Sequence, residues 1–247
     1  MNLMELKNIN KVYCQGKSEV VALKDINLVV EKGKFTTIFG PAGSGKTSLL
    51  NIISCLDKPS SGKFLFDGKE LSSFGKQDLD LFREDNIGYI SSDFDLIPYM
   101  TVYENIEYAA RLVEKNNIKS KNKVMQILQY VELYDLKNKR PNELSSAQKK
   151  RAVIAVVMVK EPVLVLLDEP TINLDSKTAD QIMEIIVKIN EDLGTTIIFS
   201  TRDLQMIDYA YKIVGIKNGK IADDEKESWI YYYGLPTWFF FLVNNKY

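Results

Sequence analysis

The chain of 247 residues contains no histidine. This absence excludes serine–histidine–aspartate and cysteine–histidine catalysis, histidine metal sites and a histidine pH switch. Any chemistry must therefore use carboxylates, hydroxyls, lysine, arginine or backbone amides. Arginine is also scarce, with five in the chain, so biased composition contributes to such scarcities.

Three further shortages narrow the class of protein. Two cysteines, Cys14 and Cys55, form neither a disulfide framework nor a C-x-x-C metal pair, which favours a reducing compartment. No apolar run reaches the roughly 20 residues of a membrane helix, and the first residues lack the apolar segment of a signal peptide. We therefore expect a cytoplasmic protein. The net charge of −1 argues against a nucleic-acid partner.

The first half of the chain changes from a strand pattern to a helical one. Alternating apolar and polar residues predict three strands within residues 1–39, and a helix should begin at Gly45. Shorter strand patterns follow at residues 64–70 and 86–90. From about Pro98 to Lys160, apolar residues recur every three or four positions, which predicts an inserted helical subdomain at about 98–160.

The second half alternates strands with helices. The apolar run of residues 163–167 ends in acidic residues, as is typical of a buried parallel strand. The elements expected after it are a helix at 178–193, a strand at 195–200, a helix at 203–210 and strands at 211–216 and 219–221. This alternation predicts an α/β fold with a parallel sheet.

A complete phosphate-loop motif, G-x-x-x-x-G-K-[ST], lies between an expected strand and an expected helix. Its residues are Gly40, Pro41, Ala42, Gly43, Ser44, Gly45, Lys46 and Thr47, and Ser48 follows. Glycines let successive N–H groups face one anion, and the helix N-terminus adds positive potential. We expect Lys46 to reach the β- and γ-phosphates and Thr47 to ligate Mg²⁺. The alternative is a glycine-rich turn without a ligand.

An acidic pair, Asp168 and Glu169, ends the apolar strand. An aspartate at this position can hold Mg²⁺, and the adjacent glutamate can polarise an attacking water. Alone, such a pair would more often cap a helix. Together with a phosphate loop, it indicates nucleotide hydrolysis.

These motifs resemble the ATP-binding subunits of ABC transporters along residues 1–222. The resemblance rests on ALKDINL, GPAGSGKTSLLNIISCLDKPSSGK, IGYISSDFDLIPYMTVYENI, PNELSSAQKKR, LVLLDEPTINLDSKT and IIFSTRD. It is nearest to the branch that serves lipoprotein release, macrolide export and cell division. It implies a P-loop NTPase (RecA-like) ABC ATPase lobe with an antiparallel β subdomain and an inserted helical subdomain. Two such subunits enclose two ATP molecules.

The resemblance also implies roles for single residues. Tyr13 matches the aromatic residue that stacks on adenine, although a lone tyrosine is more often simple packing. Asp168 matches the magnesium-binding aspartate and Glu169 the catalytic base. The pair Leu174-Asp175 matches a loop that touches the opposite site. Ser145 and Gln148 belong to the signature that contacts the partner's nucleotide.

Three elements depart from the family pattern. Ser92 stands where the family has a glutamine that helps to ligate Mg²⁺, and serine is shorter. The signature, usually LSGGQ, has Ser146 and Ala147 in place of both glycines. Arg202 replaces the switch histidine; it has donors only and could clamp the γ-phosphate or act as an arginine finger. The alternative for Arg202 is an exposed arginine without a role.

These departures predict ATP binding with hydrolysis at least about 100-fold below that of an intact family member. They favour a heterodimer with a second ABC ATPase subunit over a homodimer. The leading hypothesis is a subunit peripheral on the inner face of the cell membrane that serves a separately encoded permease. One alternative is a regulatory or structural clamp with little turnover. Another is a soluble ABC ATPase without a transport role.

The last 25 residues fall outside this resemblance. A charged linker at 223–228 precedes an aromatic tail at 229–247, which holds both tryptophans. The apolar run Trp229–Val243 is too short, and too interrupted by Gly234 and Pro236, to span a bilayer. It could pack on its own domain, dock a partner protein or lie at a membrane interface. The position of the C-terminus in the family favours the first two.

Overall fold

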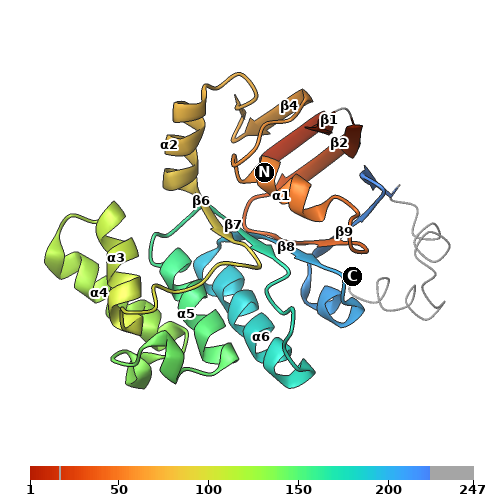
Figure 1. Ribbon diagram of the computed structural model, residues 1–247. Coiled ribbons are helices and arrows are strands. Elements are labelled where there is room, and N and C mark those ends of the chain that lie inside the picture. The colour runs from red at the N-terminus through yellow and green to blue at the C-terminus, as the bar shows by residue number, and fades with distance from the viewer. Residues whose placement is uncertain (17, 223–247) are drawn as a thin grey trace. The chain divides into compact units, whose positions relative to one another are not determined.

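A computed structural model of the protein describes residues 1–16 and 18–222, which Figure 1 shows in colour. The aromatic tail lies outside the described residues. The described chain divides into two compact units: the first comprises residues 1–80 and 198–222, and the second comprises Leu81–Ile197. Within the described ranges, no helix combines the length and apolar character needed to cross a membrane.

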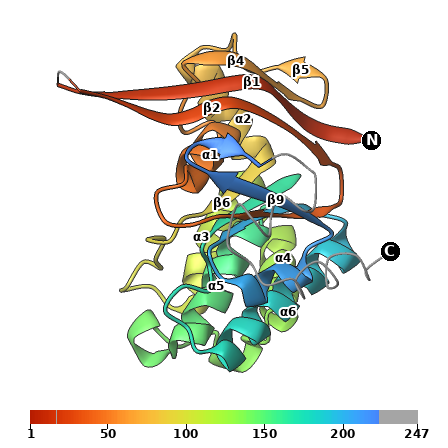
Figure 2. The same ribbon diagram turned by 90° about the vertical axis from the view of Figure 1, so that its right-hand side faces the viewer.

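The first unit contains a four-stranded antiparallel sheet in the order β2-β1-β4-β5. Its strands are β1 (Asn2–Gln15), β2 (Ser18–Glu31), β4 (Ser61–Phe66) and β5 (Lys69–Glu70). Along β2, Ile26, Leu28 and Val30 are buried while the residues between them are exposed, so one face of the strand packs on the core. Figure 2 shows this sheet with helix α1 beside β2. The strands that the sequence predicts for this sheet are confirmed.

The first unit also holds strands that carry the phosphate loop. Strand β3 (Phe35–Phe39) is buried at all five positions and pairs in parallel with β9 (Lys212–Lys217), which pairs with β10 (Lys220–Ile221). The helix expected from Gly45 is α1 (Lys46–Ile53), which buries four apolar residues: Leu49, Leu50, Ile52 and Ile53. The helix expected at 203–210 is instead a short 3₁₀-helix, η3 (Leu204–Tyr209).

The second unit contains a parallel pair of strands, β6 (Ile87–Ile90) and β7 (Leu164–Asp168). All five residues of β7 are buried, as its uninterrupted apolar run predicted. Helix α6 (Ser176–Leu193) follows, and β8 (Thr196–Thr201) then runs from this unit into the first one. The α/β class with parallel strands is therefore confirmed.

Helices make up the middle of the second unit. They are α3 (Val102–Val113), α4 (Asn117–Tyr130) and α5 (Ser146–Met158), with 3₁₀-helices η1 (Tyr134–Leu136) and η2 (Pro141–Glu143). Each α-helix begins behind a side-chain cap, from Thr101, Asn116 and Ser145 respectively, because these side chains accept the first backbone N–H groups. The three helices gather together in Figure 1. The limits of a subdomain at 98–160 remain a prediction.

The sequence did not predict helix α2 (Lys76–Asn86). Leu79 is its one buried residue, so the helix lacks the apolar stripe by which a surface helix is recognised.

Candidate functional site

Glycine geometry defines the phosphate loop between β3 and α1. Gly43 and Gly45 adopt φ values of 72° and 107°, which side chains other than glycine rarely adopt. A Cβ atom at Gly45 would also lie 2.7 Å from the carbonyl oxygen of Ala22. At Gly40 it would lie 2.2 Å from the carbonyl oxygen of Ile216. The loop therefore needs glycine at Gly43 for conformation, at Gly40 for space, and at Gly45 for both.

Backbone hydrogen bonds hold the loop on two sides. The N–H of Gly40 donates to the carbonyl of Thr201 at 3.2 Å, which ties the loop to the end of β8. The N–H of Gly219, in the turn between β9 and β10, donates to the carbonyl of Ser44 at 2.9 Å. Because both anchors are backbone groups, the loop is shaped before any ligand binds.

The side chains of the loop fit a phosphate group. Lys46 is buried, and its Nζ donates to the carbonyls of Gly40 and Pro41 at 2.8 and 3.0 Å, so the ammonium lies over the loop. The Ser44 hydroxyl is buried and has no hydrogen-bond partner among the described residues. Thr47 and Ser48 lie in the first turn of α1, where helix N–H groups and the dipole favour anions. A cation, a glycine turn and a helix start thus meet at one place.

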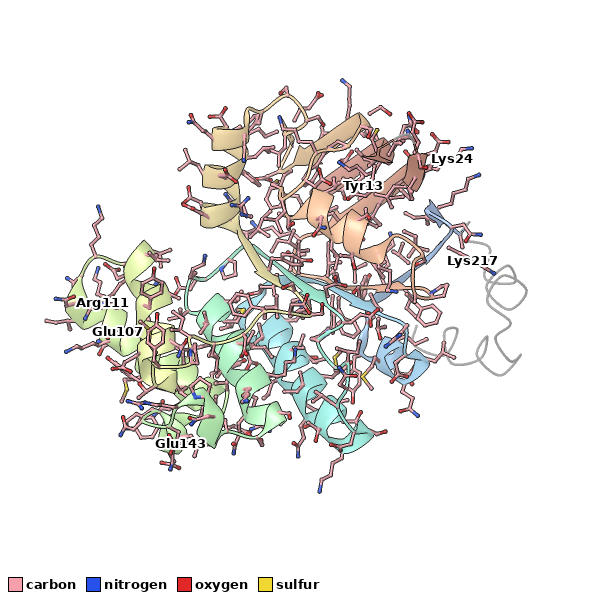
Figure 3. All side chains as sticks on the ribbon, in the orientation of Figure 1. Tyr13, Lys24, Glu107, Arg111, Glu143 and Lys217 are labelled. Carbon is pink, nitrogen blue, oxygen red and sulfur yellow. The ribbon has the colours of Figure 1, made fainter. Side chains whose placement is uncertain are left out.

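Tyr13 lies on β1 and is half-buried (Figure 3). Its hydroxyl donates to Oδ2 of Asp57 at 2.9 Å, and the Nζ of Lys11 lies 4.8 Å from the ring centroid. Burial raises the pKa of Tyr13, and a hydrogen bond with Ser48 opposes the rise. The predicted adenine-stacking residue is therefore connected to the first turn of α1.

Arg202 is exposed and directly follows β8. The turn around it is closed by the N–H of Asp203, which donates to Oγ1 of Thr201 at 2.9 Å. Since the carbonyl of Thr201 accepts from Gly40, position 202 lies one residue from a direct contact with the phosphate loop. The structure thus brings Arg202 close, along the backbone, to the loop it was predicted to serve.

The acidic pair belongs to the second unit. Asp168 is the buried last residue of β7, and Glu169 has a φ of 47°, a left-handed conformation that is uncommon for glutamate. The N–H of Ile172 donates to the carbonyl of Glu169 at 3.0 Å and stabilises this turn. Burial and the negative charge of Asp168 raise the pKa of Tyr89, so this neighbouring hydroxyl stays protonated. Strained backbone of this kind is often found at functional sites.

The remaining predicted residues also lie in the second unit. Ser92 is exposed just after β6, and its hydroxyl donates to Oδ1 of Asp93 at 3.4 Å. Ser145 caps α5: its Oγ accepts from the Gln148 N–H at 3.2 Å, and Oε1 of Gln148 accepts from the Ser145 N–H at 2.9 Å. Ser146 and Ala147 occupy the first turn, whose N–H groups point out of the helix.

The loop of Leu174 and Asp175 leads into helix α6. Asp175 caps this helix by accepting from the N–H and hydroxyl of Thr178 at 3.0 and 2.6 Å, and these bonds lower the pKa of Asp175.

The structure also identifies two residues that sequence reasoning missed, Lys11 and Asp57. They hold Tyr13 although Asp57 is 44 positions away from it along the chain. No sequence motif links Lys11 and Asp57 to Tyr13, so their contact becomes evident only in the folded structure.

Comparison with known proteins agrees with this geometry. The family model described as ABC transporter matches residues 23–172. The ABC transporter ATP-binding protein MJ0796 of Methanocaldococcus jannaschii is 35% identical over 228 residues, which are 91% of this chain and 97% of that protein. A dimeric structure of MJ0796 in a post-hydrolysis state, bound to ADP and Pi, superposes with a TM-score of 0.80 and covers 88% of this chain and 96% of that one.

Two relatives have names that state a transport role. The bacitracin export ATP-binding protein BceA of Halalkalibacterium halodurans is 36% identical and covers 90% of this chain and 87% of its own length. The macrolide export ATP-binding/permease protein MacB of a Shewanella species is 33% identical, over 92% of this chain and 35% of its own length.

Proposed function

The chain belongs to the ABC transporter family as an ATP-binding protein with the P-loop NTPase fold, and we propose that it serves a separately encoded membrane permease while hydrolysing ATP slowly. The observation that carries ATP binding is the anchored phosphate loop, with the Nζ of Lys46 at its carbonyls. Proteins of this family bind ATP with Mg²⁺. The loop amides and Lys46 would hold the β- and γ-phosphates.

Other residues would complete the reaction. Thr47 and Asp168 would hold Mg²⁺, and Ser92 would contribute a shorter oxygen ligand than a glutamine. Magnesium supplies charge neutralisation on the phosphates when it is bound. Glu169 would accept the proton of the attacking water, since its carboxylate directly follows the magnesium-binding aspartate. Tyr13 would stack on adenine.

Slow hydrolysis is proposed from the three departures. Arg202 has five donors and no acceptor, so it can bind the γ-phosphate but cannot bridge it to a donor group of the partner by accepting a hydrogen bond. Ser146 and Ala147 add side chains where a partner's phosphate would approach the start of α5. Losing one transition-state donor costs about 10²–10³ in rate, and losses within one catalytic unit are not additive.

The partners are proposed from the relatives. MJ0796 forms a dimer, and the names of BceA and MacB state export functions. We infer a complex at the inner face of the membrane with a permease and a second ATPase subunit. A heterodimer is favoured because an intact LSGGQ in the partner would complete the site built on Lys46. The same departures support a second candidate, a clamp on the permease that switches with ATP but rarely turns over.

The experiment compares ATP binding with phosphate release for the purified chain. We expect saturable binding that Lys46→Ala removes, and phosphate release at least about 100-fold below that of a family member with LSGGQ, glutamine and histidine at the three positions. Lys63→Ala, on an exposed lysine of β4, is the control for lost charge. Turnover close to that of the intact member would contradict slow hydrolysis, and absence of ATP binding would contradict the whole proposal.

A further inference from the structure

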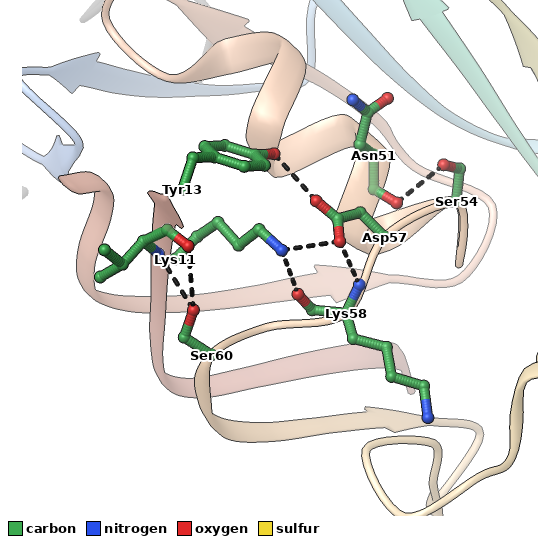
Figure 4. A network of polar contacts seen from close by, with 8 residues as sticks. Lys11, Tyr13, Asn51, Ser54, Asp57, Lys58 and Ser60 are labelled. Atoms are coloured by element: carbon green, nitrogen blue, oxygen red, sulfur yellow. Dashed lines mark hydrogen bonds and ion pairs between the residues drawn. The ribbon is translucent and has the colours of Figure 1, made fainter. Parts of the chain in front are cut away.

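Lys11, Tyr13 and Asp57 form a compact polar network in the first unit (Figure 4). Lys11 and Tyr13 are two positions apart on β1 and therefore project to the same side of the strand. The Nζ of Lys11 lies 2.6 Å from Oδ1 of Asp57, and the Tyr13 hydroxyl donates to Oδ2 at 2.9 Å. One carboxylate thus binds both neighbours, one with each oxygen.

The turn that carries Asp57 is itself held in place. The N–H of Asp57 donates to the carbonyl of Asn51 in α1 at 3.0 Å. The N–H of Ser60 donates to the carbonyl of Asn10 at 2.8 Å, and Oγ of Ser60 accepts from the N–H of Val12 at 3.0 Å. Because α1 begins at the phosphate loop, Asp57 joins β1 to the same helix that would hold the phosphates.

The network determines on which face of the Tyr13 ring a planar ligand can stack. The hydroxyl bond to Asp57 restricts rotation of the ring, and the ammonium of Lys11 lies 4.8 Å from the ring centroid. The side chain of Lys11 is 12% exposed and also donates to the carbonyl of Lys58 at 2.8 Å, so it does not swing freely. A planar ligand must then stack on the face opposite the ammonium.

We propose that Lys11 and Asp57 are positioning residues that prepare Tyr13 to stack on the adenine of ATP. This inference rests on the proposed function, since it requires ATP at the phosphate loop. Immobilising one mobile side chain on binding weakens affinity by about 3- to 10-fold. A side chain that is already ordered before binding avoids this cost. Stacking itself is the larger effect, on the order of 5- to 100-fold for one base on one aromatic ring.

The test separates the base from the phosphates by titrating ATP and inorganic tripolyphosphate, which carries no base. We expect Lys11→Met and Asp57→Asn to weaken ATP by about 3- to 10-fold and to leave tripolyphosphate unchanged. Lys11→Arg should retain ATP affinity, because guanidinium also makes an ion pair and lies over aromatic rings. Lys63→Met, which removes an exposed lysine of β4 from outside the network, should change neither affinity.

A double-mutant cycle supplies the second test. In a Tyr13→Ala background, Lys11→Met should have no further effect on ATP, because the ring it positions is gone. Tyr13→Phe keeps the ring but loses the hydroxyl's bonds to Asp57 and Ser48, and it should weaken ATP at least as much as Lys11→Met. Because Tyr13→Phe is a small change, it tests the network even if another variant fails to fold. Thermal melting of each variant is recorded first to show that it is folded.

Each alternative result overturns the inference. Equal weakening of ATP and tripolyphosphate by Lys11→Met would mean that the network supports the phosphate loop in general. Unchanged ATP affinity in Lys11→Met and Asp57→Asn would mean that Tyr13 needs no positioning. If the wild-type chain bound tripolyphosphate but not ATP, the proposed contact between adenine and Tyr13 would be contradicted. Failure of the wild-type chain to bind either ligand would overturn the proposed function, and this inference with it.

Discussion

The backbone N–H of Gly40 donates a 3.2 Å hydrogen bond to the carbonyl of Thr201, the residue that precedes Arg202. The first residue of the phosphate loop is thereby tied to the end of β8. A Cβ atom at Gly40 would lie 2.2 Å from the carbonyl oxygen of Ile216 on β9, so even the smallest side chain must displace this contact. A side chain at Gly40 therefore requires a backbone shift where the loop meets β9.

Gly40→Ala should therefore damage both stability and ATP binding. Overpacking against backbone costs about 3 kcal/mol or more. The matched control is Gly43→Ala, because Gly43 has nothing within 4 Å of a Cβ atom and differs only in its φ of 72°. Its conformational cost is about 1 kcal/mol, or roughly 2–4 °C in thermal midpoint for a chain of this size. Equal shifts for the two variants in thermal melting would contradict the contact at Ile216.

The phosphate loop was recognised from the sequence because its chemistry is local. Gly43, Gly45 and Lys46 lie within four positions, and each requirement is a property of one residue type. The buried strands and α1 were predicted for the same reason, since their apolar patterns repeat over a few residues. Helix α2 was missed because it buries only Leu79. Exposed helices carry no periodic signal when their residues are nearly all polar.

The capping of α5 yields a prediction that bears on the signature. Ser145 accepts from the N–H of Gln148, so Ser145→Ala should remove the cap and cost about 1 kcal/mol of stability. Ser146→Ala, one position later on an exposed site of the same helix, should change stability by less than about 0.5 kcal/mol. Urea unfolding followed by circular dichroism measures both. A Ser146 variant as unstable as the Ser145 variant would show that the cap is wrongly assigned.

A buried amide holds the segment before α3. Oδ1 of Asn105 accepts from the N–H of Ile97 at 2.8 Å, and its Nδ2 donates to the carbonyls of Ile97, Met100 and Thr101 at 2.9–3.2 Å. Asn105→Ala would remove the partner of the Ile97 N–H and of the Met100 carbonyl, whereas the carbonyls of Ile97 and Thr101 keep backbone bonds from Met100 and Asn105. We therefore expect a loss of about 2–3 kcal/mol in unfolding free energy.

The control for Asn105 is Glu107→Gln on the same helix. Glu107 pairs with Arg111 one turn away at 3.0 Å, with the Arg111 side chain 54% exposed and that of Glu107 17% exposed; both residues are labelled in Figure 3. A helical pair at this i,i+4 spacing contributes about 0.3–0.5 kcal/mol. Comparable losses for the two variants in chemical denaturation would contradict the role given to the buried amide.

The Asp57 network predicts a pH dependence. Burial raises the pKa of Asp57, but hydrogen bonds from Lys11, Tyr13 and the Lys58 N–H outweigh this effect and lower the pKa overall. A carboxyl with a lowered pKa in the folded state stabilises the fold above its unfolded pKa, and this stabilisation is lost as the pH falls through the folded pKa. The stability gap between wild type and Asp57→Asn should thus be constant at neutral pH and shrink below about pH 4.

Thermal midpoints of both proteins measured from pH 7 down to pH 3 test this dependence. Asp57→Asn keeps the size of the side chain, so a gap that stays constant over the whole range would mean that the charge of Asp57 does not stabilise the fold.

The network around Tyr13 also shows what sequence reasoning could not supply. Tyr13 was identified through its register with a family, whereas Lys11 and Asp57 were unremarkable charged residues in a chain that is 26% charged. Their role depends on a turn 44 positions from Tyr13 that is brought to β1 by backbone hydrogen bonds. Contacts of this kind come from tertiary structure, and no local pattern encodes them. The departures at Ser92 and Arg202, in contrast, were evident from position alone.

The replaced switch histidine gives the last prediction. Arg202 directly follows Thr201, whose carbonyl accepts from the N–H of Gly40, so position 202 lies one residue along the chain from the phosphate loop. If the lack of an acceptor at Arg202 limits hydrolysis, then Arg202→His combined with Ser146→Gly and Ala147→Gly should raise the rate of phosphate release at least about 10-fold. This gain is a fraction of the roughly 10²–10³-fold rate loss expected when one transition-state donor is missing. Arg202→His alone should give less, because residues that act as a unit are not additive. Arg140→His, at an exposed arginine of the second unit, controls for a histidine introduced elsewhere. Unchanged turnover in the triple variant, with ATP binding retained, would place the limit on hydrolysis elsewhere, and Ser92→Gln would then be the next position to restore.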